Sequence, residues 1–262
     1  MRENWRTSFR VMGAVIHHDM MLFRQDFANN VINVFAVRGV MAAIYQYIMP
    51  LMGLNNYGIF MAVTDLAHTG YFRSIGMITY LVGDMQGDQT ISFYLTLPFP
   101  QSYVFITMAL SYAIRTMILS LMLLPFMKIV LGAAFVLAKV SWVKFAIIFF
   151  VAHIFFGFMA LFFASILHRL EYLDNIWVRI MLPLWMTGCH LFPWKVAYAL
   201  SPWLGYALLC NPLTACLEGF RGALLGYDNY LPFYFCVTVL LVSIVLFGYS
   251  AIRNLKRRLD CL

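Results

Sequence analysis

Long apolar runs alternate with short polar breaks along most of the chain. Six runs stand out, at residues 31–52, 58–82, 102–126, 144–167, 175–192 and 229–252. Most contain the roughly 20 residues that a helix needs to cross about 30 Å of hydrocarbon, although the fifth has only 18. Strands of a membrane barrel would alternate apolar and polar positions over about ten residues, and these runs do not. The pattern therefore predicts an all-α membrane protein with six transmembrane helices.

Residues 1–29 follow a different pattern. Apolar side chains recur at near-helical spacing, with basic residues between them, namely Arg2, Arg6, Arg10 and Arg24. This arrangement is typical of an amphipathic helix in the membrane interface. The stretch lacks the uninterrupted apolar core and cleavage site of a signal peptide, so we expect it to remain in the mature protein.

Two stretches interrupt the helical pattern. Residues 83–100 contain two glycines and two prolines between the second and third crossings. Residues 193–228 are too apolar and aromatic for an ordinary solvated loop, which predicts a re-entrant region of short helices at the outer surface before the last crossing. Within it, Asn211 and Pro212 form a typical helix start and Gly226 a typical stop. We expect a short helix between them.

Composition excludes a soluble protein, because 63% of the 262 residues are hydrophobic and 11% are charged. We expect residues 1–262 to form a single membrane domain. If the N-terminus is cytoplasmic, ten Lys and Arg lie on that side: Arg2, Arg6, Arg10, Arg24, Arg169, Arg179, Arg253, Lys256, Arg257 and Arg258. Five lie opposite: Lys128, Lys139, Lys144, Lys195 and Arg221. This bias predicts that both termini are cytoplasmic.

The net charge of +7 does not require a nucleic-acid partner. The basic segment after the last apolar run follows a membrane helix directly, where it would face anionic lipid. The five cysteines are scattered and lack CxxC spacing, so they indicate neither a metal site nor a disulfide framework.

Five Arg, Asp or His residues lie within the first three crossings: Arg38, Asp65, His68, Arg73 and Arg115. A charge at the bilayer centre costs at least about 2.5 kcal/mol on insertion scales, so these side chains should face protein or water. One interpretation is a substrate path for an anionic head group. The alternative is structural: Asp65 pairs with Arg115 and forms a satisfied buried pair with His68, while Arg38 and Arg73 reach toward the cytoplasm.

The outer stretch supplies a second group of candidate residues, which we interpret as an outer gate: Trp194, Tyr198, Trp203, Tyr206, Asn211, Pro212, Glu218 and Arg221. The aromatic rings could stack on sugar rings, or they could form an ordinary interfacial belt. Glu218 and Arg221 stand three residues apart, a spacing that places them on one helix face as an ion pair.

Three features of the sequence resemble the type-2 ABC exporter permeases. They are the amphipathic segment before the first crossing, the stretch TISFYLTLPFPQSYVF at 90–105, and NPLTACLEGFRGALLG at 211–226. The last is the most specific, because an Asn-Pro start followed by Glu and Arg three apart recurs there in the family. The chain departs from the family in its coupling region, where GDMQGDQT is acidic only.

The resemblance implies a permease of the bacterial inner membrane that exports a lipid-linked glycan, a lipid or a drug. It implies a dimer, with a second copy of the chain or a similar permease, and two copies of an ABC ATPase. The residues that would contact the ATPase are Asp84, Asp88, Thr96 and Pro98. The chain has no GxxxxGK[ST] phosphate loop, so ATP and Mg²⁺ are expected on the partner and no cofactor on this chain.

The main alternative is an intramembrane enzyme. Asp84 and Asp88, four residues apart, could hold Mg²⁺ on a diphosphate, as in prenyltransferases. That family needs a second aspartate-rich motif, for which Glu171 and Asp174 are a poor substitute. A membrane scaffold without transport activity is a third hypothesis. No HExxH or GxSxG motif supports a protease or another hydrolase.

Overall fold

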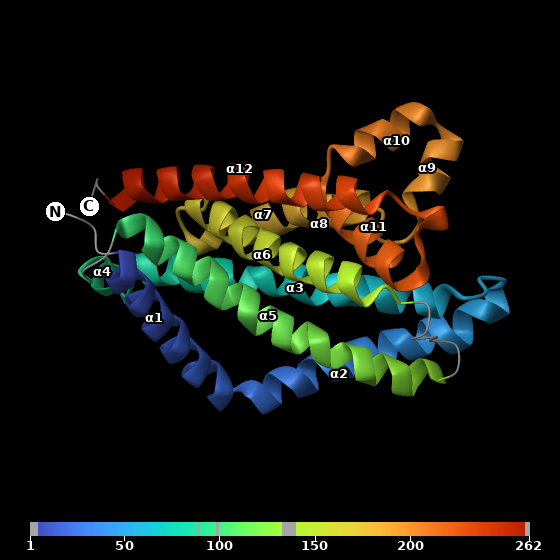
Figure 1. Ribbon diagram of the computed structural model, residues 1–262, viewed down its shortest axis with the longest axis horizontal. Coiled ribbons are helices and arrows are strands. Elements are labelled where there is room, and N and C mark those ends of the chain that lie inside the picture. The colour runs from blue at the N-terminus through green and yellow to red at the C-terminus, as the bar shows by residue number, and fades with distance from the viewer. Residues whose placement is uncertain (1–4, 88–89, 98–99, 133–139, 260–262) are drawn as a thin grey trace.

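The structure is a computed structural model that describes residues 5–87, 90–97, 100–132 and 140–259, and all regular elements in these ranges are helices (Figure 1). The long helices are α1 (Trp5–Gln25), α2 (Phe27–Ala43), α3 (Tyr57–Gln86), α5 (Gln101–Leu131), α6 (Trp142–Ile166) and α12 (Phe233–Leu259). The shorter ones are η1 (Ile44–Ile48), η2 (Met49–Met52), α4 (Thr90–Leu95), η5 (Leu170–Tyr172), α7 (Leu173–Ile176), η6 (Trp177–Met181), α8 (Leu182–Thr187), α9 (Trp194–Leu200), α10 (Pro202–Leu209), α11 (Pro212–Leu225) and η7 (Tyr227–Asn229). The all-α prediction is confirmed for the described residues.

Four helical stretches of the described chain are long and apolar enough to cross a membrane: Phe27–Met52, Gln101–Leu131, Trp142–Ile166 and Phe233–Arg258. Helix α3 is about 45 Å long by its 30 residues, but Asp65, His68 and Arg73 lower its hydropathy. The protein thus has the helices of a membrane protein, and four of the six predicted crossings meet the criteria of length and composition.

The fifth predicted crossing, residues 175–192, extends too far at its C-terminal end. The helical stretch runs through α7, η6 and α8 and stops at Thr187. Its middle, η6, is a π-helical turn, and Pro183 follows in the first turn of α8. Proline cannot donate the backbone hydrogen bond that a regular helix requires. Beyond Thr187, Cys189 has a positive φ of 61°, so the last residues of the apolar run form a turn.

Helix α6 is the centre of the bundle, where it contacts α3, α5, α11 and α12. It is apolar all round, as expected for a helix surrounded by other helices. Phe155 and Phe156 are fully buried in its middle. At Gly157, a Cβ atom would lie 2.4 Å from the carbonyl oxygen of Ala109 on α5. The two helix backbones therefore meet at a point where only glycine fits.

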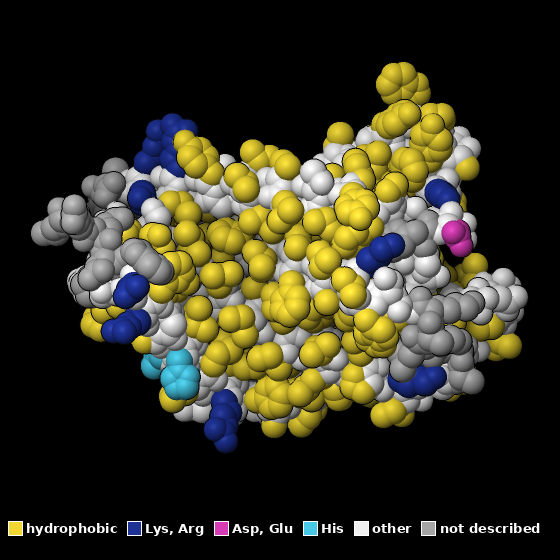
Figure 2. All heavy atoms as spheres, in the orientation of Figure 1, with side chains coloured by type: hydrophobic (Ala, Val, Ile, Leu, Met, Phe, Trp, Pro, Cys, Tyr) yellow, Lys and Arg dark blue, Asp and Glu magenta, His cyan; other side chains and the backbone are white. Residues whose placement is uncertain are grey.

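The bundle has two distinct ends (Figure 1). The start of α1, helix α4 and the last turns of α12 lie at one end, and the α9–α10 hairpin projects from the other. Figure 2 shows hydrophobic side chains across the middle of one face, with Lys and Arg toward the two ends. Such an apolar band between charged ends fits a bilayer.

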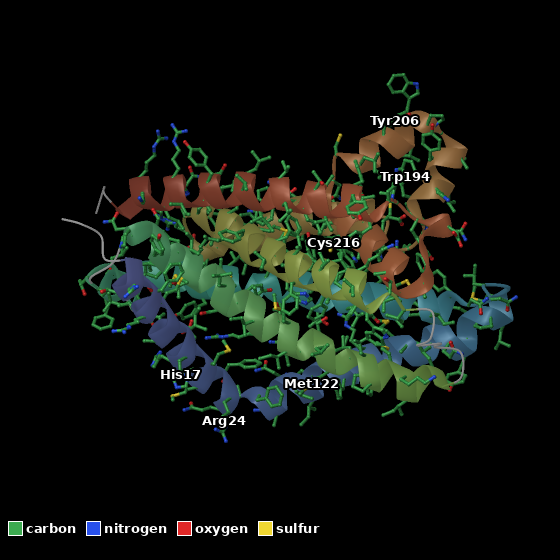
Figure 3. The ribbon with its side chains drawn as sticks, in the orientation of Figure 1. His17, Arg24, Met122, Trp194, Tyr206 and Cys216 are labelled. Carbon is green, nitrogen blue, oxygen red and sulfur yellow. The ribbon has the colours of Figure 1, made fainter. Side chains whose placement is uncertain are left out.

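Of the interface helix predicted for residues 1–29, the structure shows the helix α1 over Trp5–Gln25, and its place in the membrane interface stays a prediction. Helix α1 runs obliquely to the bundle and packs on α5, with Ser8 and Val15 buried. His17 and Arg24 point away from the bundle in Figure 3. The chain bends at Asp26 and continues as α2, whose exposed apolar side chains include Ile32, Val37 and Val40.

Candidate functional site

The predicted helix between Asn211 and Gly226 is confirmed as α11. The side chain of Asn211 accepts a hydrogen bond from the backbone N–H of Leu213 at 3.0 Å, and Pro212 occupies the first turn. The Asn211 amide also donates to the carbonyl oxygen of Leu184 at 2.6 Å, which fixes the start of α11 against α8. Gly226, with a φ of 101°, ends the helix. A positive φ at this position favours glycine.

Arg221 follows Glu218 by about one turn of α11, and neither side chain is exposed to solvent. Nη1 of Arg221 lies 3.3 Å from Oε1 of Glu218, so the predicted ion pair is confirmed. Nη2 donates to the hydroxyl of Thr64 on α3 at 2.8 Å. The guanidinium also donates to three carbonyl oxygens of the turn after α8, those of Cys189, His190 and Phe192. A planar guanidinium with five N–H donors suits this many acceptors.

Glu218 completes the arrangement, which we call the Glu218–Arg221 clamp. Its carboxylate accepts the backbone N–H of Trp194, at the start of α9, at 3.1 Å and that of Leu231, before α12, at 3.3 Å. Burial raises the pKa of Glu218, while the Arg221 charge and these N–H groups oppose the shift. The clamp therefore joins α3, α9, α11 and the start of α12 through charged groups that no solvent reaches.

The aromatic residues of the predicted gate lie on the α9–α10 hairpin, where Figure 3 labels Trp194 and Tyr206. The indole N–H of Trp194 donates to the carbonyl oxygen of Gly205 at 2.8 Å and ties the two helices together. The Tyr198 and Tyr206 rings meet edge to face, with centroids 5.6 Å apart. Trp203 is 85% exposed. These rings suit a membrane interface. Whether they stack on sugar rings or form an ordinary interfacial belt stays open.

Three of the predicted path residues meet between α2 and α3. Nη1 of Arg38 lies 3.0 Å from Oδ1 of Asp65, and Nη2 of Arg38 contacts the ring of His68. The His68 ring stacks on Phe72, with centroids 3.7 Å apart. Asp65 and His68 are therefore linked through Arg38 and do not pair directly.

The pairing of Asp65 with Arg115, which the structural alternative predicted, is wrong, because Asp65 pairs with Arg38. Asp65 lies eight residues, or about 12 Å, from the N-terminal end of α3, whereas Arg115 lies 16 residues, or about 24 Å, from the C-terminal end of α5. Arg38 lies level with Asp65. Arg115 instead approaches Asp19 of α1, with 3.5 Å between Nη2 and Oδ1 and 3.0 Å between Nη2 and the backbone oxygen.

The other two path residues, Arg73 and Arg115, line a separate cavity of about 360 Å³. Its walls come from α1, α2, α3, α4 and α5, near the end that holds α4. Nη2 of Arg73 donates to the side-chain oxygen of Asn30 at 2.8 Å. The Tyr112 hydroxyl, also in the wall, donates to the carbonyl oxygen of Gly70 at 2.6 Å. The five predicted residues thus form two groups at different depths.

The predicted coupling element begins with a buried carboxylate. Asp84 accepts the backbone N–H groups of Thr90 at 2.9 Å and Ile91 at 2.7 Å, one on each carboxylate oxygen. It thereby caps the start of α4 and holds it against the end of α3. Thr96 is exposed just after α4, and its hydroxyl donates to the carbonyl oxygen of Phe93.

Asp88 and Pro98, the other two predicted coupling residues, lie outside the described residues. No group of three or more His, Cys, Asp and Glu side chains in the described part of the chain is arranged to hold a metal ion. Asp84 itself acts as a helix cap, because both of its oxygens accept backbone hydrogen bonds.

Comparison with known proteins does not assign the chain to a family. No protein-family model matches it, and neither does any curated protein. The likeness to type-2 exporter permeases therefore rests on the sequence motifs described above, and any function must be inferred from the residues themselves.

Sequence reasoning missed the partners that other helices supply. Asp19, Asn30 and Tyr112 complete the cavity, and Thr64 completes the clamp. Asp19 and Asn30 look like ordinary polar positions near the bend between α1 and α2. Only the packing of α1 and α2 against α3 and α5 gives them a role, so no local signal in the sequence could have identified them.

Proposed function

We propose that this chain is the permease subunit of an ATP-driven exporter for an amphiphile, such as a lipid-linked glycan, a lipid or a drug. Two copies would enclose the pathway in a bacterial inner membrane, with two copies of a separate ABC ATPase at the cytoplasmic face. The six crossings would be α2 with η1 and η2, α3, α5, α6, α7 to α8, and α12. The apolar band and its charged ends support this placement.

The observation that carries the proposal is the linkage of α4 to a membrane helix. Asp84 belongs to the last turns of α3, and both of its oxygens bind the start of α4. Ile91 of α4 is buried against the bundle, whereas Phe93 is 62% exposed. A protein that binds the exposed side of α4 would therefore move α3 with it. An exporter whose energy comes from a separate subunit needs such a connection.

The start of α1 and the end of α12 lie at the same end as α4, where a soluble partner would have access to them (Figure 1). Arg253, Lys256 and Arg257 give the last turns of α12 a positive charge, which suits the cytoplasmic face. The α9–α10 hairpin and the Glu218–Arg221 clamp would then lie outside. The clamp would hold the outer helices together, and opening it could gate release.

Copurification tests the proposal. The full chain, with an affinity tag, is expressed together with the ATPase genes beside its own gene and purified in detergent. We expect an ABC ATPase subunit to remain bound in equal amount and to hydrolyse ATP with Mg²⁺. If the chain purifies alone and none of these ATPases binds it, the permease proposal is overturned.

A further inference from the structure

The cavity between α1, α2, α3, α4 and α5 combines an apolar wall with a few polar groups. Leu22, Phe23 and Leu119 contribute apolar surface, and Arg73 and Arg115 contribute charge. The volume of about 360 Å³ is large enough for a small head group. The residues of α1 and α4 in its wall place the cavity near the end that holds α4, which is the expected cytoplasmic end (Figure 1).

Arg73 differs from the other arginines of the buried clusters. Arg38, Arg115 and Arg221 lie 3.0, 3.5 and 3.3 Å from carboxylate oxygens. Arg73 has no carboxylate at such a distance among the described residues, and its hydrogen-bond acceptor is the neutral amide of Asn30. It lies about 20 Å from the cytoplasmic end of α3. A cation at that depth without a counter-ion is costly, so a bound anion would stabilise it.

Two further polar atoms of the cavity wall have no partner in the described structure. They are Oγ of Ser111 and Nε of Arg115, both buried. The two residues are four apart on α5 and therefore share one helix face. Buried polar groups usually have hydrogen-bond partners, and an orphaned donor costs free energy. A ligand with several acceptor oxygens would satisfy both groups together with Arg73.

We propose that this cavity binds the phosphodiester of an anionic amphiphile, with Arg73 as its counter-ion. Ser111 and Arg115 donate further hydrogen bonds, and the acyl chains follow the apolar wall. Asp19 already balances Arg115, and Asp26, which also lines the cavity, is exposed to solvent that screens its charge. One cation remains for the ligand, which matches a singly charged phosphodiester better than a free phosphate dianion. The site rests on the proposed function in one respect, that the chain handles amphiphiles.

Binding can be measured without any ATPase, so failure of this proposal and failure of the export proposal are distinguishable. The full chain in detergent is titrated with dioctanoyl phosphatidylglycerol, and the Kd is measured by microscale thermophoresis. We expect Arg73→Gln to raise the Kd about tenfold or more, because charge-assisted hydrogen bonds are the strong ones. Arg253→Gln, at an exposed arginine of α12, should leave the Kd unchanged and is the matched control.

Ser111→Ala guards against a folding artefact. Since Oγ has no partner in the described structure, its loss should leave the Tm unchanged while raising the Kd about threefold or more. Dioctanoylglycerol, which lacks the phosphate, should bind equally weakly to the wild type and to Arg73→Gln.

Three results would overturn the proposal. The first is an unchanged Kd in the Arg73→Gln variant. The second is an equal loss of binding in Arg253→Gln, which would indicate attraction to the whole basic face. The third is binding of inorganic phosphate as tight as that of phosphatidylglycerol, because the site would then select a free anion and not a lipid.

Discussion

Arg221 and Glu218 each depend on the other for their charge. Both side chains are fully buried, and removing one partner of a buried ion pair typically costs about 3–5 kcal/mol, because the remaining charge has no counter-ion. We therefore expect Glu218→Ala to lower the free energy of unfolding by this amount, measured by unfolding of the purified chain in detergent. Glu171→Ala, at an exposed glutamate, should have almost no effect.

The double variant Glu218→Gln with Arg221→Met distinguishes the cost of an unpaired buried charge from the cost of lost side-chain contacts. Apolar or neutral replacements of a whole buried pair are often tolerated better than the loss of one partner. The double variant should therefore be more stable than Glu218→Ala. Wild-type stability in Glu218→Ala would contradict the clamp.

Local spacing was enough to predict the pair of Glu218 and Arg221, because residues three apart on a helix lie on the same face. It was not enough for Arg115. Its partner, Asp19, is 96 residues away in the sequence and approaches only because α1 packs on α5. Residue pairs within one helix can thus be read from the sequence, whereas pairs between helices depend on packing that the spacing does not encode.

At the scale of elements, two glycines in helices provide a matched comparison. A Cβ at Gly157 would lie 2.4 Å from the carbonyl oxygen of Ala109, whereas a Cβ at Gly13 of α1 meets nothing within 4 Å. We expect Gly157→Ala to lower the Tm, because α5 and α6 must separate. Gly13→Ala should leave the Tm unchanged or raise it, since alanine is favoured over glycine in a helix by about 1 kcal/mol.

Thermal unfolding of both variants in one detergent checks the prediction. If Gly157→Ala raises the Tm as Gly13→Ala does, the close approach of α5 to α6 is not what selects glycine at 157. The glycine would then matter only through its low helix propensity.

The sequence predicted helix bounds correctly where neighbouring residues mark the start or the end of the helix. The Asn211 cap and the Gly226 stop placed α11 correctly, and long apolar runs located α5 and α6. The apolar run at 175–192 led to a predicted crossing that extends beyond the end of the helix. Hydropathy does not indicate the π-helical turn or the turn around Cys189. The central position of α6 was not predicted either, since apolar residues on all sides of a helix suit both lipid and protein neighbours.

For the whole molecule, α4 is the element expected to meet a soluble partner. Phe93 is exposed on it, so Phe93→Ala should reduce the amount of ATPase that copurifies about tenfold, which is in the range of an aromatic contact at an interface. Tyr172→Ala, at a similarly exposed aromatic on the same end, should have a smaller effect. Equal losses in both variants would argue against α4 as the coupling helix.

The enclosure of α6 has a consequence for the order in which the helices insert and pack. Helix α6 lies in the middle of the chain, yet α11 and α12, which the ribosome synthesises later, cover one of its sides. Gly248 of α12 comes close to the Phe158 ring of α6. Until α12 enters the membrane, that side of α6 would contact lipid. Its apolar side chains are compatible with such contact. We therefore expect biogenesis of the bundle in two steps, in which α6 inserts first because it is hydrophobic and loses its lipid neighbours when the later helices insert.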